Sequence, residues 1–285
     1  MTFTTPGRGG LSLSRYEVSM DLIDIGVNLS SERFDEDRPH VVERALSAGV
    51  CQMMLTGCSV ESSQQALELA RTRPGVLFAT AGVHPHDAQS WDSQSAQTIR
   101  RLAQEPEVVA IGECGLDFNR NYSPHAEQKA AFDAQLSIAA ELKMPVFLHE
   151  RDASEAFEEI LCRHRSGLVG GVVHCFTGSA GALERWLEMD MHIGITGWIC
   201  DERRGKQLQS LVSRVPLERL LIETDAPWLL PRDLRPRPSK GRNEPAFLPH
   251  ICEAVARYGG HAPEQVARAS SENARRLFGL TQTGG

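Results

Sequence analysis

Four short apolar runs that each end in a metal-capable side chain are the feature that most constrains this sequence. Short runs rich in β-branched residues are typical of strands that are buried on both faces. An ionisable group at the end of such a strand costs free energy unless a partner compensates it. One such ending could be explained by a neighbouring arginine, but four in one chain are hard to explain by core packing. The runs are Val108–Ile111 before Glu113, Val146–Leu148 before His149, Val169–Val173 before His174, and Leu220–Ile222 before Glu223, Thr224 and Asp225.

Strand and helix patterns alternate along the chain at a regular spacing. Glu113 to His149 spans 36 residues, His149 to His174 spans 25, and His174 to Asp225 spans 51, which is two units. Eight strands at this spacing indicate a (β/α)8 TIM barrel of the α/β class. The alternative, an open doubly wound sheet, lacks a Gly-x-Gly-x-x-Gly motif after the first strand. We expect strands at Leu22–Val27, Val50–Leu55, Val76–Val83, Val108–Ile111, Val146–His149, Val169–His174, His192–Thr196 and Leu220–Asp225.

A single barrel domain is expected over residues 20–280. Residues 1–19 are rich in Gly, Ser and Thr and are predicted to be a disordered leader, so either Met1 or Met20 could be the start. Residues 281–285 are expected to form a short tail.

The composition is that of an ordinary soluble globular protein, with 41% hydrophobic and 24% charged residues. No apolar run approaches the length of a membrane span or a signal peptide, so a cytoplasmic protein without a membrane partner is expected. The net charge of −7 argues against an extended basic surface but allows a local basic patch. The seven cysteines have no Cys-x-x-Cys spacing and support neither a disulfide framework nor a thiolate zinc site.

If the strands are parallel neighbours, the side chains at their ends converge at one end of the barrel. Enzymes with this fold keep their chemistry at the carboxyl ends of the strands. Glu113, His149, His174 and Asp225 together offer the nitrogen and carboxylate oxygen atoms that suit a divalent cation.

The loop after the eighth strand is long and rich in proline and positive charge. One interpretation is a solvated connection stiffened by proline. The other is a rim that binds the phosphates of a nucleic acid, because Arg and Lys supply most backbone contacts. Aromatic residues that follow strand ends, Phe176, Trp198 and Trp228, could stack on a base or pack the loops against the barrel. The cations of the loop are Arg232, Arg235, Arg237, Lys240 and Arg242.

Several segments resemble the TatD family of metal-dependent deoxyribonucleases, and the resemblance covers about residues 20–280. Two further blocks, 194–198 and 200–205, resemble the namesake branch of this family rather than its paralogues. The resemblance implies a TIM barrel of the metal-dependent hydrolase type. For that branch it implies a magnesium-dependent 3′-to-5′ exonuclease acting on single-stranded DNA and RNA and taking part in the repair of oxidative (H2O2-induced) DNA damage. The segments are Asp24–Leu29, Ala81–His86, Ile111–Asp117, His174–Gly178 and Glu223–Pro227.

Residue by residue, the resemblance implies that Glu113, His149 and His174 are metal ligands and that Asp225 is catalytic and can also reach metal. The family's first strand usually carries Asp-x-His-x-His, but here Gly26 and Asn28 stand at the two histidine positions. A second metal site is therefore in doubt, and one tightly bound ion is expected. The variant Gly26→His with Asn28→His is expected to strengthen a second site. Magnesium is the expected ion, although nitrogen ligands also admit manganese or zinc.

Other residues receive less specific interpretations. His84 could steady a phosphate or leaving oxygen as part of the catalytic set, or be a structural residue before Pro85. Arg151 could bind substrate phosphate or pair with a carboxylate, and Arg235, Arg237 and Lys240 are the expected phosphate contacts of the loop. We expect a monomer. The alternative functions are a barrel hydrolase acting on a small amide, ester or aminoacyl bond, and a non-catalytic binding barrel.

Overall fold

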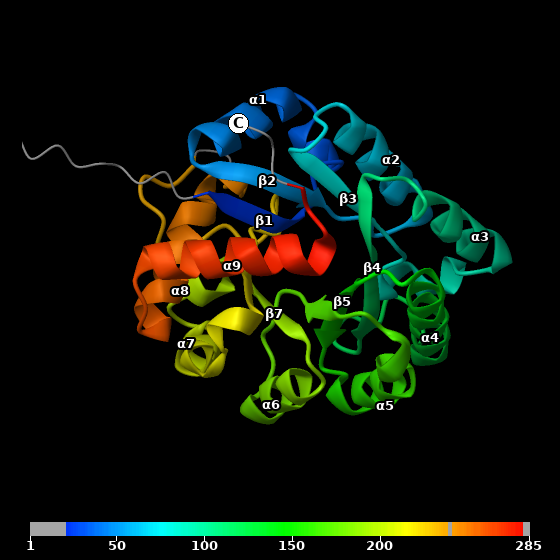
Figure 1. Ribbon diagram of the computed structural model, residues 1–285. Coiled ribbons are helices and arrows are strands. Elements are labelled where there is room, and N and C mark those ends of the chain that lie inside the picture. The colour runs from blue at the N-terminus through cyan, green and yellow to red at the C-terminus, as the bar shows by residue number, and fades with distance from the viewer. Residues whose placement is uncertain (1–20, 239–240, 282–285) are drawn as a thin grey trace, which may run out of the picture.

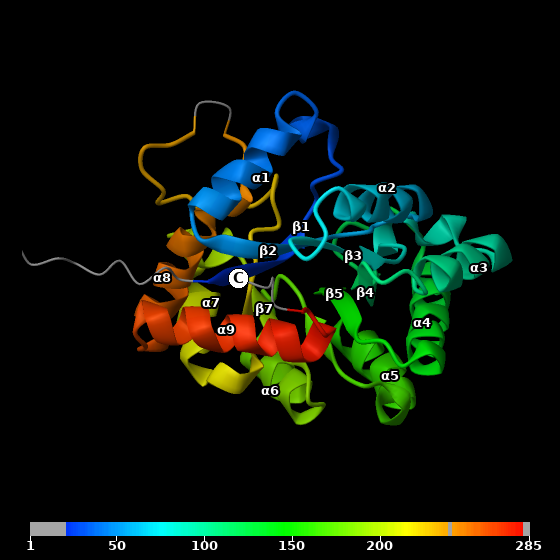
Figure 2. The ribbon, with the colours of Figure 1, turned by 45° about the horizontal axis from the view of Figure 1, so that its top comes forward.

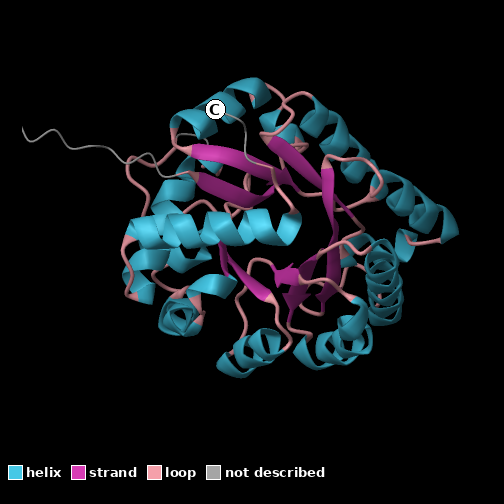
Figure 3. Cartoon of the chain, viewed as in Figure 1, coloured by secondary structure: helices cyan, strands magenta, loops and turns pink. Residues whose placement is uncertain are grey.

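The eight predicted strands form one parallel sheet in the order β1 to β8, ringed by helices (Figures 1 and 3). This computed structural model describes residues 21–238 and 241–281. The predicted leader, Lys240 and most of the predicted tail therefore lie outside the described residues. The strands are β1 (Leu22–Val27), β2 (Val50–Leu55), β3 (Leu77–Ala81), β4 (Val108–Asp117), β5 (Val146–Arg151), β6 (Gly171–Val173), β7 (His192–Ile195) and β8 (Leu220–Ile222). The helices are α1 (Arg38–Ser47), α2 (Val60–Arg71), α3 (Ser93–Leu102), α4 (His125–Leu142), α5 (Ser154–His164), α6 (Ala180–Glu188), α7 (Lys206–Leu211), α8 (Leu248–Gly259) and α9 (Pro263–Phe278).

The first and last strands meet and nearly close the barrel. Val27 forms a parallel bridge with Ala226, and the Asp225 amide donates to the Gly26 carbonyl at 2.8 Å. The predicted (β/α)8 barrel is thus confirmed. No helix in the described part of the chain is both long and apolar enough to cross a membrane.

Apolar side chains fill two separate regions of the barrel. The larger core lies between the strands and the surrounding helices and contains residues such as Phe132, Phe157 and Trp186. The smaller core includes Ile23 and Phe147 from the strands together with Phe278 from α9. In Figure 1, α9 runs across the near end of the barrel. Its Asn273 amide donates to the Leu217 and Leu220 carbonyls, so α9 covers the amino ends of the strands and leaves the carboxyl ends for the site.

Strand β4 continues six residues beyond the predicted end at Ile111. Gly112 and Gly115 both lie within the strand, with φ values of 138° and 147°. A Cβ atom on Gly115 would overlap the His149 carbonyl oxygen of β5. The two glycines therefore let β4 and β5 approach closely and bring Glu113 beside His149.

Candidate metal centre

The side chains that follow the strands converge on one cavity at the carboxyl end of the barrel, as the sequence predicts. The cavity has a volume of about 610 Å3. It is lined by Glu113 from β4, His149 from β5, His174 just after β6 and Asp225 after β8. The structure thus brings all four predicted metal-site residues to one place.

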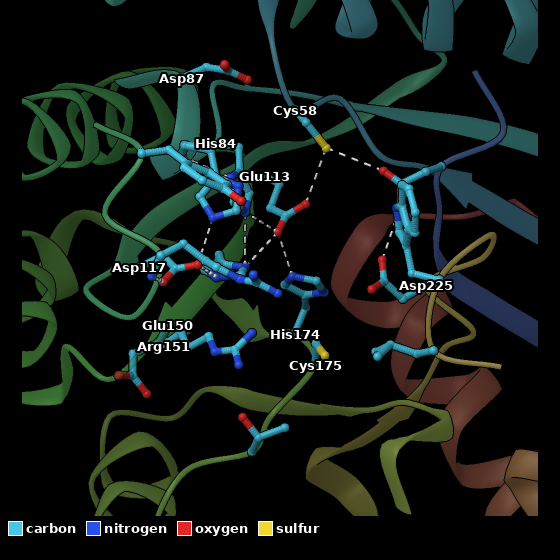
Figure 4. A pocket seen from close by; sticks show the side chains of 18 of the residues that line it. Cys58, His84, Asp87, Glu113, Asp117, Glu150, Arg151, His174, Cys175 and Asp225 are labelled. Carbon is cyan, nitrogen blue, oxygen red and sulfur yellow. Dashed lines mark hydrogen bonds and ion pairs between the residues drawn. The ribbon is translucent and has the colours of Figure 1, made fainter. Parts of the chain in front are cut away.

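The Glu113 carboxylate lies at the centre of three imidazoles (Figure 4). Its Oε1 atom is 2.8 Å from His149 Nδ1 and 2.8 Å from His174 Nε2. His84 Nε2 is 3.2 Å from the same oxygen and 3.2 Å from His149 Nδ1. The His84 side chain therefore lies within the cluster of candidate metal ligands.

The charges of this cluster depend on one another. Burial alone would raise the pKa of Glu113, but the imidazoles of His174, His84 and His149 hold it well below its usual value. Burial would lower the pKa of His174, yet Glu113 and Glu223 raise it well above its usual value. Burial outweighs Glu113 at His84 and lowers the pKa of that imidazole to about 4. His84 is therefore neutral at pH 7, which is the form that binds a metal.

The donor set fits a divalent cation. Three ring nitrogens face one carboxylate oxygen, and two of these nitrogens also face each other. The opposite ring nitrogens face carboxylates, with His174 Nδ1 at 3.4 Å from Glu223 Oε2 and His149 Nε2 at 3.6 Å from Asp117 Oδ2. Metal-ligating histidines usually have such an outer carboxylate, which orients the ring. The described residues thus supply both inner donors and the groups that orient them.

Asp225 lines the same cavity but lies apart from Glu113 (Figure 4). The Asn28 amide donates to its Oδ1 atom at 3.0 Å, and the Asp225 backbone has the left-handed φ of 55°. Such strain in a residue other than glycine is common at functional sites. Burial raises the pKa of the Asp225 carboxyl to about 7, so the group can exchange a proton near neutral pH.

Glu223 occupies the space beside Gly26. A Cβ atom on Gly26 would overlap Glu223 Oε2, and a Cβ atom on Gly194 would lie 2.7 Å from Oε1. The carboxylate accepts from the Cys175 amide at 2.6 Å and faces His174. The expectation for Gly26→His with Asn28→His therefore needs correction. An imidazole at position 26 must first displace Glu223 from His174 and Cys175, so this variant should disturb the first site rather than simply strengthen a second.

Several residues of the site were not found from the sequence. Asp117 Oδ2 lies 2.8 Å from His86 Nε2, and neither residue was among the predicted site residues. Cys58 lies between the two halves of the site, with its sulfur 3.4 Å from Glu113 Oε2 and 3.4 Å from Asn28 Oδ1. Asp117 is the last residue of the motif that contains Glu113, and His86 is the last residue of the motif that contains His84. Their place in these motifs could have identified them as candidate site residues.

The proline-rich segment after β8 is less cationic than its sequence suggests. Arg232 pairs with Asp201 at 3.3 Å, and Arg242 pairs with Asp37 at 2.7 Å. Arg235 and Arg237 are exposed, and they do not line the cavity. In Figure 2 this orange segment stands out from the barrel beside α1.

Other cavity-lining residues suit a nucleic-acid strand. Arg151 and Arg120 line the cavity and offer positive charge. Trp198 and Trp228 also line it, whereas Phe176 is buried and packs in the core, which removes it as a stacking candidate. Tyr122, with 62% of its surface exposed, is a rim aromatic that the sequence analysis did not single out.

Comparison with known proteins agrees with this fold. The sequence profile of the TatD related DNase family matches residues 23–279. The 3′-5′ ssDNA/RNA exonuclease TatD of Pantoea vagans is 56% identical over 259 residues, which are 91% of this chain and 100% of that protein. The protein of the same name from Salmonella typhimurium is 54% identical over 257 residues, which are 90% and 98% of the two chains. The crystal structure of the TatD homologue YjjV from Escherichia coli K12 superposes with a TM-score of 0.84 at 27% identity and covers 92% of this chain and 100% of its own. The resemblance found in the sequence is thus confirmed, and this chain belongs to the family of TatD related DNases.

Proposed function

We propose that this protein is a metal-dependent exonuclease that removes nucleotides from the 3′ ends of single-stranded DNA and RNA. The observation that carries the proposal is the convergence of Glu113 with three imidazoles in one cavity that also contains Asp225. The names of relatives that are 54–56% identical over nearly their whole length support the substrate and the direction.

Glu113, His84, His149 and His174 are the residues that would hold the ion. When bound, a divalent metal polarises a phosphoryl oxygen and lowers the pKa of water. Mg2+ is the proposed ion, and the nitrogen donors also admit Mn2+ or Zn2+.

The remaining residues act on the water and the substrate. Asp225 would accept the proton of the attacking water through the oxygen that Asn28 does not hold. Arg151 would bind a phosphate next to the bond that is cleaved, since it lines the cavity from the end of β5. Trp198, Trp228 and Tyr122 offer faces on which terminal bases can stack without regard to sequence.

A labelled oligonucleotide digest tests this proposal. A single strand labelled at its 5′ end should shorten progressively, while one labelled at its 3′ end should release the label as a mononucleotide at once. EDTA should stop both reactions, and a panel of Mg2+, Mn2+ and Zn2+ should restore them to different extents. Metal-independent cleavage, or internal cleavage without mononucleotides, would contradict the proposal.

Replacing Arg235, Arg237 and Lys240 together by Ser should weaken binding to single strands of any sequence. Arg235 and Arg237 are exposed on the segment that leads away from Asp225, where they could contact phosphates. The slope of log affinity against log salt concentration should flatten by about 0.7 for each lost phosphate contact. Fluorescence anisotropy with an unlabelled competitor, at several salt concentrations, measures this slope.

The matched control removes three cations from the opposite end of the barrel. Arg101 and Lys143 are exposed and precede the amino ends of β4 and β5, and Arg268 is exposed on α9. The control carries Arg101→Ser, Lys143→Asn and Arg268→Ser, with Asn at position 143 because its φ is 55°. An equal loss of slope in both triple variants would mean that only net charge matters and that the loop is a connection.

The cavity should bind one divalent ion tightly in the absence of substrate, not two. Gly26 offers no ligand, and the Asn28 amide is already bonded to Asp225. Calorimetric titration of metal-free protein with Mn2+ should show one tight site, with any second site far weaker. Two sites of similar micromolar affinity would refute this expectation.

The repair role, the cytoplasmic location and the monomeric state belong to the same proposal. Cells that lack the gene should survive hydrogen peroxide less well, and only an active copy should restore survival. An Asp225→Asn copy is the matched control, since it should leave the barrel folded. Equal rescue by both copies would separate any repair phenotype from nuclease activity. Light scattering should give the mass of one chain, 31.4 kDa.

A further inference from the structure

A second group of metal-capable side chains lies outside the cavity. We call Cys200, Asp233 and His250 the rim cluster. Cys200 ends the 3-10 turn Gly197–Cys200 after β7, Asp233 lies in the segment after β8, and His250 lies in the first turn of α8. Their potential ligand atoms all lie within 4.8 Å of one another, and none of the three residues lines the cavity.

The geometry of the rim cluster resembles that of the metal centre. His250 Nε2 is 2.7 Å from Asp233 Oδ1, close to the 2.8 Å that separates Glu113 from His149 and from His174. The three residues stand 33 and 17 positions apart in the sequence, so their meeting is a result of the fold. This spacing also explains why the cysteine pattern of the sequence did not indicate a metal site.

We propose that the rim cluster binds one zinc ion. A thiolate, an imidazole and a carboxylate are zinc's common protein ligands, one of each kind here. The two negative charges of Cys200 and Asp233 would balance the charge of the ion. Cys200 is only 2% exposed, whereas the side chains of Asp233 and His250 are 26% and 28% exposed. The ion would enter from the side of Asp233 and His250, and water can complete the fourth position.

The thiol distinguishes this site from the metal centre. Sulfur is a soft donor that selects zinc over magnesium, whereas the proposed ligands in the cavity are a carboxylate and imidazoles. Cys58 and Cys175 also line the cavity, so they are the thiols against which Cys200 must be compared. The rim cluster would therefore be specific for zinc, whereas the cavity, for which Mg2+ is proposed, also admits Mn2+ or Zn2+ through its nitrogen donors.

The position of the rim cluster indicates what the zinc would do. It would join the turn after β7 and the segment after β8, which contribute Trp198 and Leu229 to the cavity lining, to the start of α8. Without an ion, the part of that segment at Arg232 and Asp233 is held by Arg232 to Asp201 at 3.3 Å, by Asp233 to Arg257 at 3.6 Å and by Asp233 to His250 at 2.7 Å. Arg232 and Arg257 are 40% and 59% exposed, and pairs of this kind contribute little. Zinc would hold in place the segment that carries Arg235 and Arg237. An effect of this on substrate binding rests on the proposed function, whereas zinc binding itself does not.

The competing explanation is a hydrogen-bonded cluster without a metal, in which Asp233 accepts from His250 and faces Arg257. Cobalt separates the two explanations, because Co2+ occupies zinc sites and absorbs strongly in the near ultraviolet when a thiolate binds it. Metal-free full-length protein titrated with Co2+ should develop this absorption, and Cys200→Ser should abolish it. Cys58→Ser and Cys175→Ser are the matched controls and should keep it. Absorption that survives in Cys200→Ser, or that never develops, would overturn the proposal.

Zinc measurements provide a second readout that does not depend on a buried substitution. His250→Gln should bind one zinc ion fewer than the wild type. Its zinc affinity at this site should fall by more than the roughly 10–100-fold that loss of an outer-shell partner costs. At about 100 times the dissociation constant, zinc should raise the melting temperature of the wild type by roughly 5–10 °C more than that of His250→Gln. Equal zinc content and equal shifts would refute the site.

Failure of the zinc site can be told apart from failure of the proposed function. The nuclease assay in Mg2+ tests the cavity and not the rim cluster. If the protein digests single strands but binds no zinc at the rim cluster, only the zinc proposal is refuted. If the protein binds zinc through Cys200 but releases no mononucleotides, only the proposed function is refuted.

Discussion

Glu113→Gln should reduce turnover at saturating metal by about 10³-fold or more, which corresponds to about 4 kcal/mol of transition-state stabilisation. Glu113 is the one carboxylate that three imidazoles share, at 2.8, 2.8 and 3.2 Å. Gln keeps the size of the side chain but removes the charge that the metal requires, so metal affinity should fall while the barrel stays folded. Single-turnover digestion, calorimetric metal titration and circular dichroism together measure the three effects.

Glu150→Gln is the matched control for this experiment. Glu150 is also buried and lines the same cavity, but its Oε1 atom accepts from the Ala153 amide and the Ser154 hydroxyl at the start of α5. Gln can still accept these bonds, so activity should change far less than in Glu113→Gln. Near wild-type turnover in Glu113→Gln, or equal losses in both variants, would place the metal centre elsewhere.

Asp225→Asn should lower activity by about 10²–10⁴-fold, the usual contribution of a general base. Asn can still accept the bond from Asn28 but cannot take a proton from water. Tight binding of the first metal ion should persist, because Glu113 and the imidazoles hold that ion. Turnover close to the wild-type value would show that another group accepts the proton.

The same variant should make the metal-free protein more stable at pH 8, by up to about 4 kcal/mol. Burial raises the pKa of Asp225 to about 7, above the value of roughly 3.9 in an unfolded chain. Between these values the folded protein binds more protons than the unfolded chain, so the free energy of unfolding falls as pH rises from about 4 to 7. Above pH 7 the folded protein carries the full free-energy cost of a buried, ionised Asp225 carboxylate. Asn has no charge and removes this cost. Urea unfolding in EDTA at pH 5 and pH 8 should show a larger gain at pH 8.

Asp37→Asn is a control of the opposite sign. The Arg242 guanidinium, together with Arg44, holds the pKa of Asp37 well below its usual value despite partial burial. Its charged form therefore stabilises the fold above about pH 4, and this stability is lost as pH falls. Asp37→Asn should lower stability at pH 8, by about 1 kcal/mol or less because the pair is partly exposed. A loss of stability in Asp225→Asn as well would show that Asp225 is not a strained carboxyl.

The apolar runs of the sequence determined the architecture and the end of the barrel at which the site lies. Buried strands are recognisable because their side chains must be apolar on both faces, and parallel strands place their last residues at one edge. Glu113, His149, His174 and Asp225 could therefore be predicted to share a cavity. The family motifs are also short stretches of sequence that can be recognised without the structure, and the comparisons confirmed the family.

How far β4 extends was decided by the fold. Gly112 and Gly115 continue β4 beyond its apolar run, although a glycine permits a turn as readily as a close neighbour. The same ambiguity affected Gly26. From the sequence, the absence of a side chain at Gly26 was interpreted as the loss of a metal ligand. In the fold, the same absence makes room for the Glu223 carboxylate beside His174.

Partners far apart in the chain were decided only by the tertiary structure. His84 lies in the metal centre because it follows β3, which pairs with the strand β4 that carries Glu113. The sequence around His84 or around Glu113 does not show that the two strands are neighbours. Arg242 is neutralised by Asp37, 205 residues away, so the charge of a loop cannot be counted from its sequence. Cys200, Asp233 and His250 likewise become a candidate zinc site only when the turn after β7, the segment after β8 and the first turn of α8 meet. Local pattern fixes where a strand runs and ends, but the direction, pairing and ionisation of a side chain depend on neighbours that only the folded barrel supplies.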